Sequence, residues 1–598
     1  MKQILFVFII GLLAACVKEP EYAESEIEAV KQAMKNDFLS KTVRKPGGQP
    51  FKIGKPGGTI NLVTNGEPKS FNIISSGDSS AKNILEPLHD YLVNYDPYKK
   101  EFTPQAAEKF EVETPESGGM IVRYYLRDNM FWTTSDGKVR VPVTADDPIF
   151  WYDEIHGDAA LRTSGYAAQF VTLDDGSEAR ITIHKIDRLT FEFHLPKIDA
   201  NPLLSTNMNF GPKYIYEKAK KERGIEGVLN VLSIDTDLKT LPSMGPMHIV
   251  EYTPGVRIVM KRNPDYWKKD EAGTVLPYYE TAIYKVVGDL NAENLLFKSG
   301  QLDYTNVRHE NLEEYINKEN KNYTVYDGGT SLGSDYITFN QNPAKLEAKK
   351  HKWFASTQFR QAMSCLINRE RIIRQIFRGL GEPAHDFFCK ANPMYNEKIK
   401  LEYTYNPNHA LRLLNKAGFD LGDDKKMRDA EGNPVEFDLL VNGENNIRLD
   451  IATIFADEAA NLGIKINIRS MDFQKIIDML TSTFDWDCTI MSFGSNYWPT
   501  QGSNVWPSNG RLHLWYPMQE TPATEWEAEI DKLYEAGTYA LDNDKAKQIW
   551  DKYQRIILEQ CPLIYIAHPY SFLAVNNRWE NVFFDTLNGL ESDVLFLE

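Results

Sequence analysis

The chain has 598 residues and a formal net charge of -17, with 67 lysines and arginines against 84 aspartates and glutamates. It contains no block of five or more basic residues, and this charge balance argues against nucleic acid as a partner. A chain of this length exceeds what one hydrophobic core can serve, so we expect two or three domains.

The first fifteen residues have the pattern of a signal peptide. One early cation, Lys2, precedes an apolar run over residues 4–13, and small residues then lead to Cys16. The run is shorter than the roughly 20 residues that a membrane-spanning helix needs. Leu13-Ala14-Ala15-Cys16 resembles the lipobox of bacterial lipoproteins, in which cleavage falls before the cysteine and the cysteine becomes acylated. We expect residues 1–15 to be removed and lipid on Cys16 to anchor the protein to a membrane, in a periplasmic or other extracytoplasmic place; the alternative is a plain secretory signal.

Residues 16–57 are charged and contain Lys-Pro-Gly-Gly at 45–48, with a second copy at 55–58. Pro-Gly pairs break regular structure, and the charges favour contact with water. The sequence therefore predicts a flexible tether, with a short helix over residues 26–39.

The rest of the chain mixes strand and helix patterns. Alternating or β-branched runs predict strands over residues 59–64, 121–126 and within 181–195. Apolar stripes at helical spacing predict helices over residues 359–377, 409–417, 525–536 and 545–559. This order indicates an α/β fold without a repeat of 20 to 50 residues.

No catalytic or metal-binding pattern is present. The chain has no GxSxG, no HExxH, no GxxxxGK[ST] and no GxGxxG that follows a strand and opens a helix. Four cysteines remain beyond Cys16, namely Cys365, Cys389, Cys488 and Cys561, and none lies in a CxxC or a Cys/His cluster. We predict no enzyme activity, no cofactor and no metal. The pairing of the four cysteines stays open, and Cys365 is expected in the core.

Five motifs occur in order along the chain: Tyr125-Leu126-Arg127-Asp128-Asn129 with Val143-Thr144-Ala145-Asp146-Asp147-Pro148; Lys261-Arg262-Asn263-Pro264-Asp265-Tyr266-Trp267; Phe297-Lys298-Ser299-Gly300-Gln301-Leu302-Asp303; Phe359-Arg360-Gln361-Ala362-Met363-Ser364; and Tyr405-Asn406-Pro407 with Leu413-Leu414-Asn415-Lys416-Ala417-Gly418. Together they resemble the family 5 solute-binding lipoproteins of ABC importers, which include oligopeptide-, dipeptide- and nickel-binding proteins and some oligosaccharide binders. The resemblance covers about residues 58 to 585.

The resemblance implies a two-lobed periplasmic-binding-protein-like fold of the large three-subdomain type, with a hinge between the lobes. Its expected parts are lobe I at 58–90, 200–330 and 562–598, an inserted subdomain at 91–199, and lobe II at 331–561. The crossings are expected near residues 335–340 and 563–566. The resemblance further implies a monomer that delivers its solute to an ABC permease and an ATPase encoded as separate proteins.

In peptide-binding relatives, residues after the first strand and a loop of the second lobe line the cleft, and an aspartate of that loop pairs with the amino terminus of the peptide. Aligned on Pro499, that position is Ser495 here. Either Glu67, Asp485, Asp487 or another carboxylate replaces the aspartate, or the solute presents no free amine. The candidate contacts that the resemblance implies are Thr64, Asn65, Glu67, Asn340, Phe493, Ser495, Asn496, Tyr497 and Trp498.

A peptide-like solute is the first hypothesis for this site. A neutral oligomer such as an oligosaccharide is the second, because sugar faces stack on aromatic rings and Tyr497, Trp498 and Trp506 crowd this loop. A third hypothesis keeps the fold without transport, as a surface adhesin or receptor.

Overall fold

The computed structural model describes residues 32, 35–75, 79–163, 165–173, 175–318, 321–494 and 497–598. The predicted signal peptide and Cys16 lie outside these residues. Helices and strands alternate along the described chain, so the predicted α/β class is confirmed.

One group of sheets contains the N-terminal half of the chain and its C-terminal end. A four-stranded sheet has the order β1 (Thr59–Thr64), β15 (Thr281–Val286), β14 (Arg257–Arg262) and β13 (Met247–Thr253), with β1 and β15 parallel. A second sheet joins β16 (Tyr304–Asn306), β26 (Ala567–Asn576) and β17 (Tyr323–Thr330). The inserted stretch forms a third, antiparallel sheet of β10 (Thr182–Lys185), β11 (Thr190–Leu195), β5 (Met120–Leu126) and β4 (Ala107–Glu113). The strands expected over residues 59–64, 121–126 and 181–195 are therefore confirmed.

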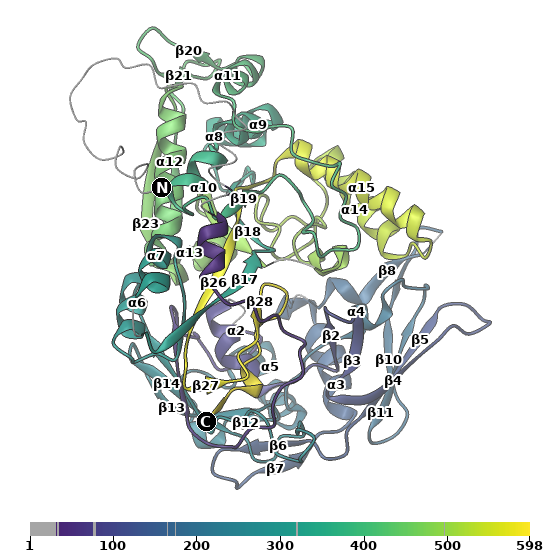
Figure 1. The fold of residues 1–598 in the computed structure, drawn as a ribbon. Helices are drawn as coiled ribbons and strands as arrows, with labels where there is room; N and C mark the ends of the chain where they lie inside the picture. The colour runs from purple at the N-terminus through teal and green to yellow at the C-terminus, as the bar shows by residue number, and fades with distance from the viewer. Residues whose placement is uncertain are drawn as a thin grey trace.

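The other group is a five-stranded sheet with helices on both faces. Its order is β23 (Lys465–Met471), β22 (Glu436–Asn442), β24 (Cys488–Phe493), β18 (Ser334–Phe339) and β25 (Leu563–Tyr565). Side chains alternate along these strands, so one face packs with Ile337 and Ile490 in one core cluster, and the opposite face packs with Tyr336 and Met491 in another. Helices pack on both sides of the sheet and bury both of these faces (Figure 1).

The chain passes between the two groups twice, at adjacent places. Strand β17 leads into β18 through residues 331–333, and β25 leads into β26 through Ile566. The crossings are tied together, because β18 and β25 pair antiparallel and the Ser334 hydroxyl oxygen accepts hydrogen bonds from the backbone N–H groups of Ile566 and Ala567. Figure 1 shows β26 and β17 running side by side between the upper and lower parts of the molecule.

The helices follow the apolar stripes, with one break that the pattern did not predict. The expected helix over 359–377 is two helices, α9 (Thr357–Leu366) and α10 (Arg369–Gln375), because the Asn368 side chain caps α10 by accepting from the Arg371 N–H. The other three are confirmed as α11 (Pro407–Lys416), α14 (Glu525–Thr538) and α15 (Asn543–Gln560). Further α-helices in the described part of the chain are α2 (Ser79–Leu85), α3 (Asp146–Phe150), α4 (Pro202–Thr206), α5 (Lys213–Asn230), α6 (Leu290–Lys298), α7 (His309–Asn317), α8 (Ala348–Ala355), α12 (Asn446–Ala460) and α13 (Phe473–Asp478).

No disulfide joins the four cysteines within the described residues, and Cys365 is buried in the core as expected. Burial raises the pKa of the Cys365 thiol to about 11, so the thiol stays protonated and unreactive at neutral pH.

Residues 41–58, which we call the N-terminal strap, are not a flexible tether. The strap lies along the first group of sheets and is held at several points. The Val43 N–H donates to the Val325 carbonyl at 2.9 Å, and the Gly47 and Gly48 N–H groups donate to the carboxylates of Asp585 and Glu591. The predicted tether is therefore wrong for this part of the chain. Instead of breaking contact, the glycines permit it, since a Cβ at Gly47 or Gly48 would lie 2.2 to 2.5 Å from the Tyr98 side chain.

Replacing Gly48 by alanine should detach the strap. Gly48 has φ +71°, and its added Cβ would meet the Tyr98 ring at 2.5 Å. We expect trypsin to cleave after Arg44 and Lys52 several-fold faster in G48A than in the parent protein. The matched control is Gly118→Ala, which has a similarly positive φ but no atom within 4 Å of the added Cβ. Equal cleavage rates in both variants would contradict the close contact at Gly48.

Candidate functional site

The two groups of sheets meet where β1 and β24 end. After β24 the chain turns into the loop that carries Tyr497 and Trp498, and both rings contact Tyr95 of β2 (Val93–Asp96), at centroid distances of 5.8 and 6.0 Å. Strand β2 belongs to the first group of sheets, so these rings bridge the two parts of the molecule. We call the region between two loops the cleft edge: the loop after β1, with Asn65 and Glu67, and the loop after β24, with Tyr497 and Trp498.

Aromatic side chains line the β24 side of the cleft edge. The Phe493 ring lies 4.9 Å from Tyr336 of β18, and the antiparallel register places Phe493 opposite Ser334, directly at the crossing. Burial raises the pKa of Tyr497 to about 12, so its phenol stays neutral and able to donate a hydrogen bond. The indole Nε1 of Trp498 is buried and has no hydrogen-bond partner in the described part of the chain.

The loop after β1 is built from short local contacts. The Thr64 hydroxyl donates to the Gly66 carbonyl at 2.5 Å, and Asn65 is exposed. The Glu67 carboxylate accepts the Gly255 N–H at 2.9 Å. Burial, and then a hydrogen bond to Glu67, raise the pKa of Tyr252 to about 12. Glu67 is therefore already bound to the turn between β13 and β14.

The structure does not bring Asn340 together with the other candidates. It follows the end of β18 that is remote from the crossing. It is fully buried, and its side-chain amide donates to the carbonyls of Phe484 and Trp486 while its oxygen accepts the Asn342 N–H. The hydrogen bonds of its side chain are therefore all made within lobe II. A sequence alone does not show in which direction β18 runs from the crossing.

The aspartate replacements that the sequence offered are also remote from the cleft edge. Asp485 and Asp487 precede β24, whose opposite end carries Phe493, and the Asp487 carboxylate accepts from Lys350 at 2.6 Å and from the Asp438 N–H at 3.0 Å. Ser495 and Asn496 lie outside the described residues.

Two cleft-edge residues, Glu444 and Gln474, were not among the sequence candidates. The Glu444 Oε2 atom and both polar atoms of the Gln474 amide are buried without a hydrogen-bond partner in the described part of the chain. Glu444 could have been found from the sequence, because it is a carboxylate just after the largely apolar strand at residues 437–441, and ligands bind at the carboxyl ends of such strands. Gln474 carries no such signal, because only the folded structure places it beside Gly66.

Other contacts hold the two parts of the molecule together along the same side. The Arg511 guanidinium donates to the Arg162 carbonyl at 3.0 Å, and the Ala200 N–H donates to the Thr538 carbonyl at 3.3 Å. The N-terminal half of the chain therefore also contacts α14 and the segment before it.

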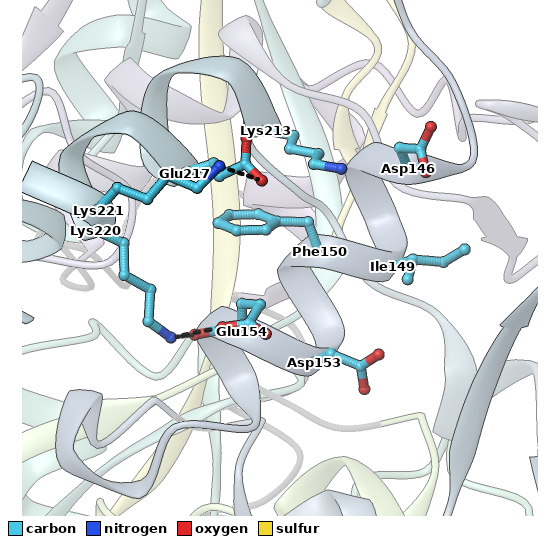
Figure 2. A pocket seen from close by; sticks show the side chains of 9 residues that line it. All are labelled: Asp146, Ile149, Phe150, Asp153, Glu154, Lys213, Glu217, Lys220 and Lys221. Carbon is cyan, nitrogen blue, oxygen red and sulfur yellow. Dashed lines mark hydrogen bonds and ion pairs between the residues drawn. The ribbon is translucent and has the colours of Figure 1, made fainter. Parts of the chain in front are cut away.

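A surface pocket of about 440 Å³ lies elsewhere, between α3 and α5 (Figure 2). Two ion pairs form within it, as Figure 2 shows for Lys220 with Glu154 and Lys221 with Glu217. Asp146 and Asp153 pair with Lys185 and Arg180 beside it. None of the predicted contacts lines the pocket, and because most of its charged side chains are already paired, we do not assign the solute to it.

Within the described residues, no group of three or more His, Cys, Asp or Glu side chains could hold a metal ion. In the same part of the chain, no helix combines the length and apolar character that crossing a membrane requires.

Two parts joined by paired crossings, with an aromatic and polar edge between them, define a two-lobed binding protein. Residues 101–510 match the bacterial extracellular solute-binding proteins, family 5, middle region, and the chain belongs to this family of non-enzymatic binding proteins of ABC importers.

Three similar proteins illustrate the family. A probable ABC transporter-binding protein of Deinococcus radiodurans is 28% identical over 93% of each chain. The oligopeptide-binding protein AppA of Bacillus subtilis, solved with a nonapeptide, has a TM-score of 0.75 at 22% identity and covers 91% of this chain and 100% of its own. The periplasmic binding protein MelB of Agrobacterium fabrum, solved with stachyose, has a TM-score of 0.78 at 20% identity and covers 97% of this chain and 92% of its own. The predicted family and fold are confirmed.

Proposed function

We propose that the cleft edge captures a peptide-like solute and that the protein delivers this solute to the permease of an ABC importer, with the ATPase as a further separate subunit. The observation that supports a solute site here is that polar atoms of Glu444, Gln474 and Trp498 are buried without a hydrogen-bond partner in the described part of the chain, while Gln474 and Trp498 lie beside Gly66 and Tyr95 of the first group of sheets. Buried polar groups cost free energy unless they are hydrogen-bonded, and a polar solute between the lobes would supply those bonds.

The lobes that enclose the solute would be those expected from the sequence, with lobe II at 331–561. Motion would occur at the two adjacent crossings, where few residues join the lobes. Closure around a solute in this way is one of the common hinge movements of binding proteins. The predicted contacts that remain proposed are Thr64, Asn65, Glu67, Phe493, Ser495, Asn496, Tyr497 and Trp498.

The similar proteins bind solutes of different classes, since AppA was solved with a nonapeptide and MelB with stachyose. We favour a peptide because the described part of the cleft edge holds a carboxylate oxygen without a partner, which suits a cationic group better than a sugar hydroxyl. The rings of Tyr497 and Trp498 are the feature that favours an oligosaccharide.

We further propose that lipid on Cys16 holds the protein at the membrane next to its importer. An intact-mass measurement of protein from a membrane fraction would test this. We expect the mass of the chain from Cys16 onward plus acyl groups, and release of Cys16→Ser protein into the soluble fraction. A mass without acyl groups would contradict the proposal that Cys16 is lipidated.

The solute class can be tested directly with purified protein. We expect a degenerate pentapeptide library with free amino termini to raise the melting temperature, because a ligand that binds only the folded state stabilises it by mass action. Native mass spectrometry would then show which peptides are retained. A rise with stachyose alone would favour the oligosaccharide hypothesis, and no shift with either probe would contradict solute capture at this site.

A further inference from the structure

Glu444 lies at the edge of lobe II that faces lobe I. The parallel register pairs Leu440 of β22 with Thr489 of β24, so Glu444 and Phe493, each four residues further on, reach the same edge of the sheet. Neighbouring strands lie about 4.8 Å apart. In open α/β sheets, ligands bind outside the carboxyl ends of the strands.

The Glu444 carboxylate is held in place by one hydrogen bond, and only one of its two oxygens has a partner. Its Oε1 accepts the Phe473 N–H at 3.2 Å, and its Oε2 is buried with no hydrogen-bond partner among the described residues. The cation four residues further on, Arg448, does not neutralise it. The Arg448 guanidinium donates to Asp335, Asn442 and Ser492 at 2.9, 3.0 and 2.6 Å.

Gln474 brings the same region into contact with lobe I. It follows Phe473, whose N–H holds Glu444, and its Nε2 lies 3.9 Å from where a Cβ on Gly66 would be. Gly66 belongs to the loop after β1. Both polar atoms of the Gln474 amide are buried and unpartnered in the described part of the chain. A carboxylate oxygen and an amide thus lie where the two lobes meet, with unused capacity to hydrogen-bond.

We propose that Glu444, assisted by Gln474, binds an ammonium group of the solute, and so performs in this chain the task for which Ser495 lacks a carboxylate. This inference rests on the proposed function. A buried carboxylate that accepts from one backbone N–H retains an oxygen for a charge-assisted hydrogen bond, and the Gln474 carbonyl oxygen can accept a second N–H of the same ammonium. The ammonium comes either from the amino terminus of a peptide or from a lysine side chain.

The test uses three pentapeptide libraries on the full chain without its signal peptide. The first has free amino termini and no lysine or arginine, the second is the same library N-acetylated, and the third is N-acetylated and contains lysine. We expect binding of the first library, or of the third, to exceed that of the second by about 100-fold, since a buried charge pair loses on this order when one partner is removed. The first library identifies the amino terminus as the source of the ammonium, and the third identifies the lysine side chain.

The variant Glu444→Gln keeps the shape and removes the charge, and we expect it to reduce binding of the preferred library to the level of the second. The matched control is Glu436→Gln at the start of β22, the strand that leads to Glu444, where the carboxylate pairs with Lys465 outside the cleft edge. Equal binding of all three libraries, or full binding by E444Q with the fold intact by circular dichroism, would overturn the role of Glu444 while leaving solute capture in place. Binding of stachyose alone would overturn it as well, and no binding of any probe would contradict the proposed function itself.

Discussion

Replacing Trp498 by alanine should weaken binding of the pentapeptide library by about 30- to 100-fold, equivalent to about 2 to 3 kcal/mol. The Trp498 ring lies 6.0 Å from the Tyr95 ring of the opposite lobe, so its loss removes apolar contact between the lobes. Large aromatic side chains in desolvated contacts commonly contribute this much. Isothermal titration with the retained peptides would measure the change.

Trp498→Phe is the matched variant, because it keeps a ring against Tyr95 and removes only the indole N–H. We expect it to lose less than half of the binding free energy that the alanine variant loses. A double-mutant cycle with Tyr95→Ala would isolate the contact between the lobes. If the effects of W498A and Y95A were additive, the contact would not contribute to closure.

Replacing Glu527 by alanine should destabilise lobe II by about 3 to 5 kcal/mol, because it leaves several buried donors unpaired. Glu527 is 2% exposed and accepts from His513, Trp515 and Thr524 at 3.2, 3.1 and 2.8 Å. Urea denaturation would measure the loss. The matched control is Glu525→Ala, an exposed glutamate in the first turn of the same helix, for which we expect a change below about 0.5 kcal/mol.

This contribution should also depend on pH. Burial by itself raises the pKa of Glu527, but hydrogen bonds led by His513 outweigh it, and the pKa lies below the ordinary value of 4.5. A carboxyl whose pKa is lower in the folded state adds stability above its unfolded pKa, and this stability is lost as the pH falls through the folded value. The difference in stability between the parent and Glu527→Gln should therefore shrink below about pH 4.5. A difference that grew on acidification would contradict the assigned direction.

The parts of the fold that the sequence predicted are those governed by local pattern. Strand β1 begins and ends at the expected residues, and α11 differs from its expected bounds by two residues or fewer, because Asn406 and Pro407 mark its start. The break between α9 and α10 was not predicted, because the apolar spacing continues across it. A single capping asparagine, Asn368, separates the two helices.

The candidate site was harder to predict because its residues meet only through distant parts of the chain. Strand direction decides that Phe493 lies at the crossing while Asn340 lies at the remote end of β18, and no local pattern states that direction. Gln474 reaches the cleft edge only because α13 approaches the loop after β1. The strap was misread for the same reason, since its partners Tyr98, Asp585 and Glu591 are far away in the sequence.

The strap bears on where this protein can be shortened. From the two Lys-Pro-Gly-Gly sequences alone, residues before 58 would be treated as a disordered leader and removed for expression. The Tyr98 ring lies against Gly47 and Gly48, and the Phe596 ring lies against Gly54, so truncation would expose both rings to water. A protein that begins at Thr59 should therefore aggregate on purification, whereas one that begins ahead of Lys35 should stay monodisperse.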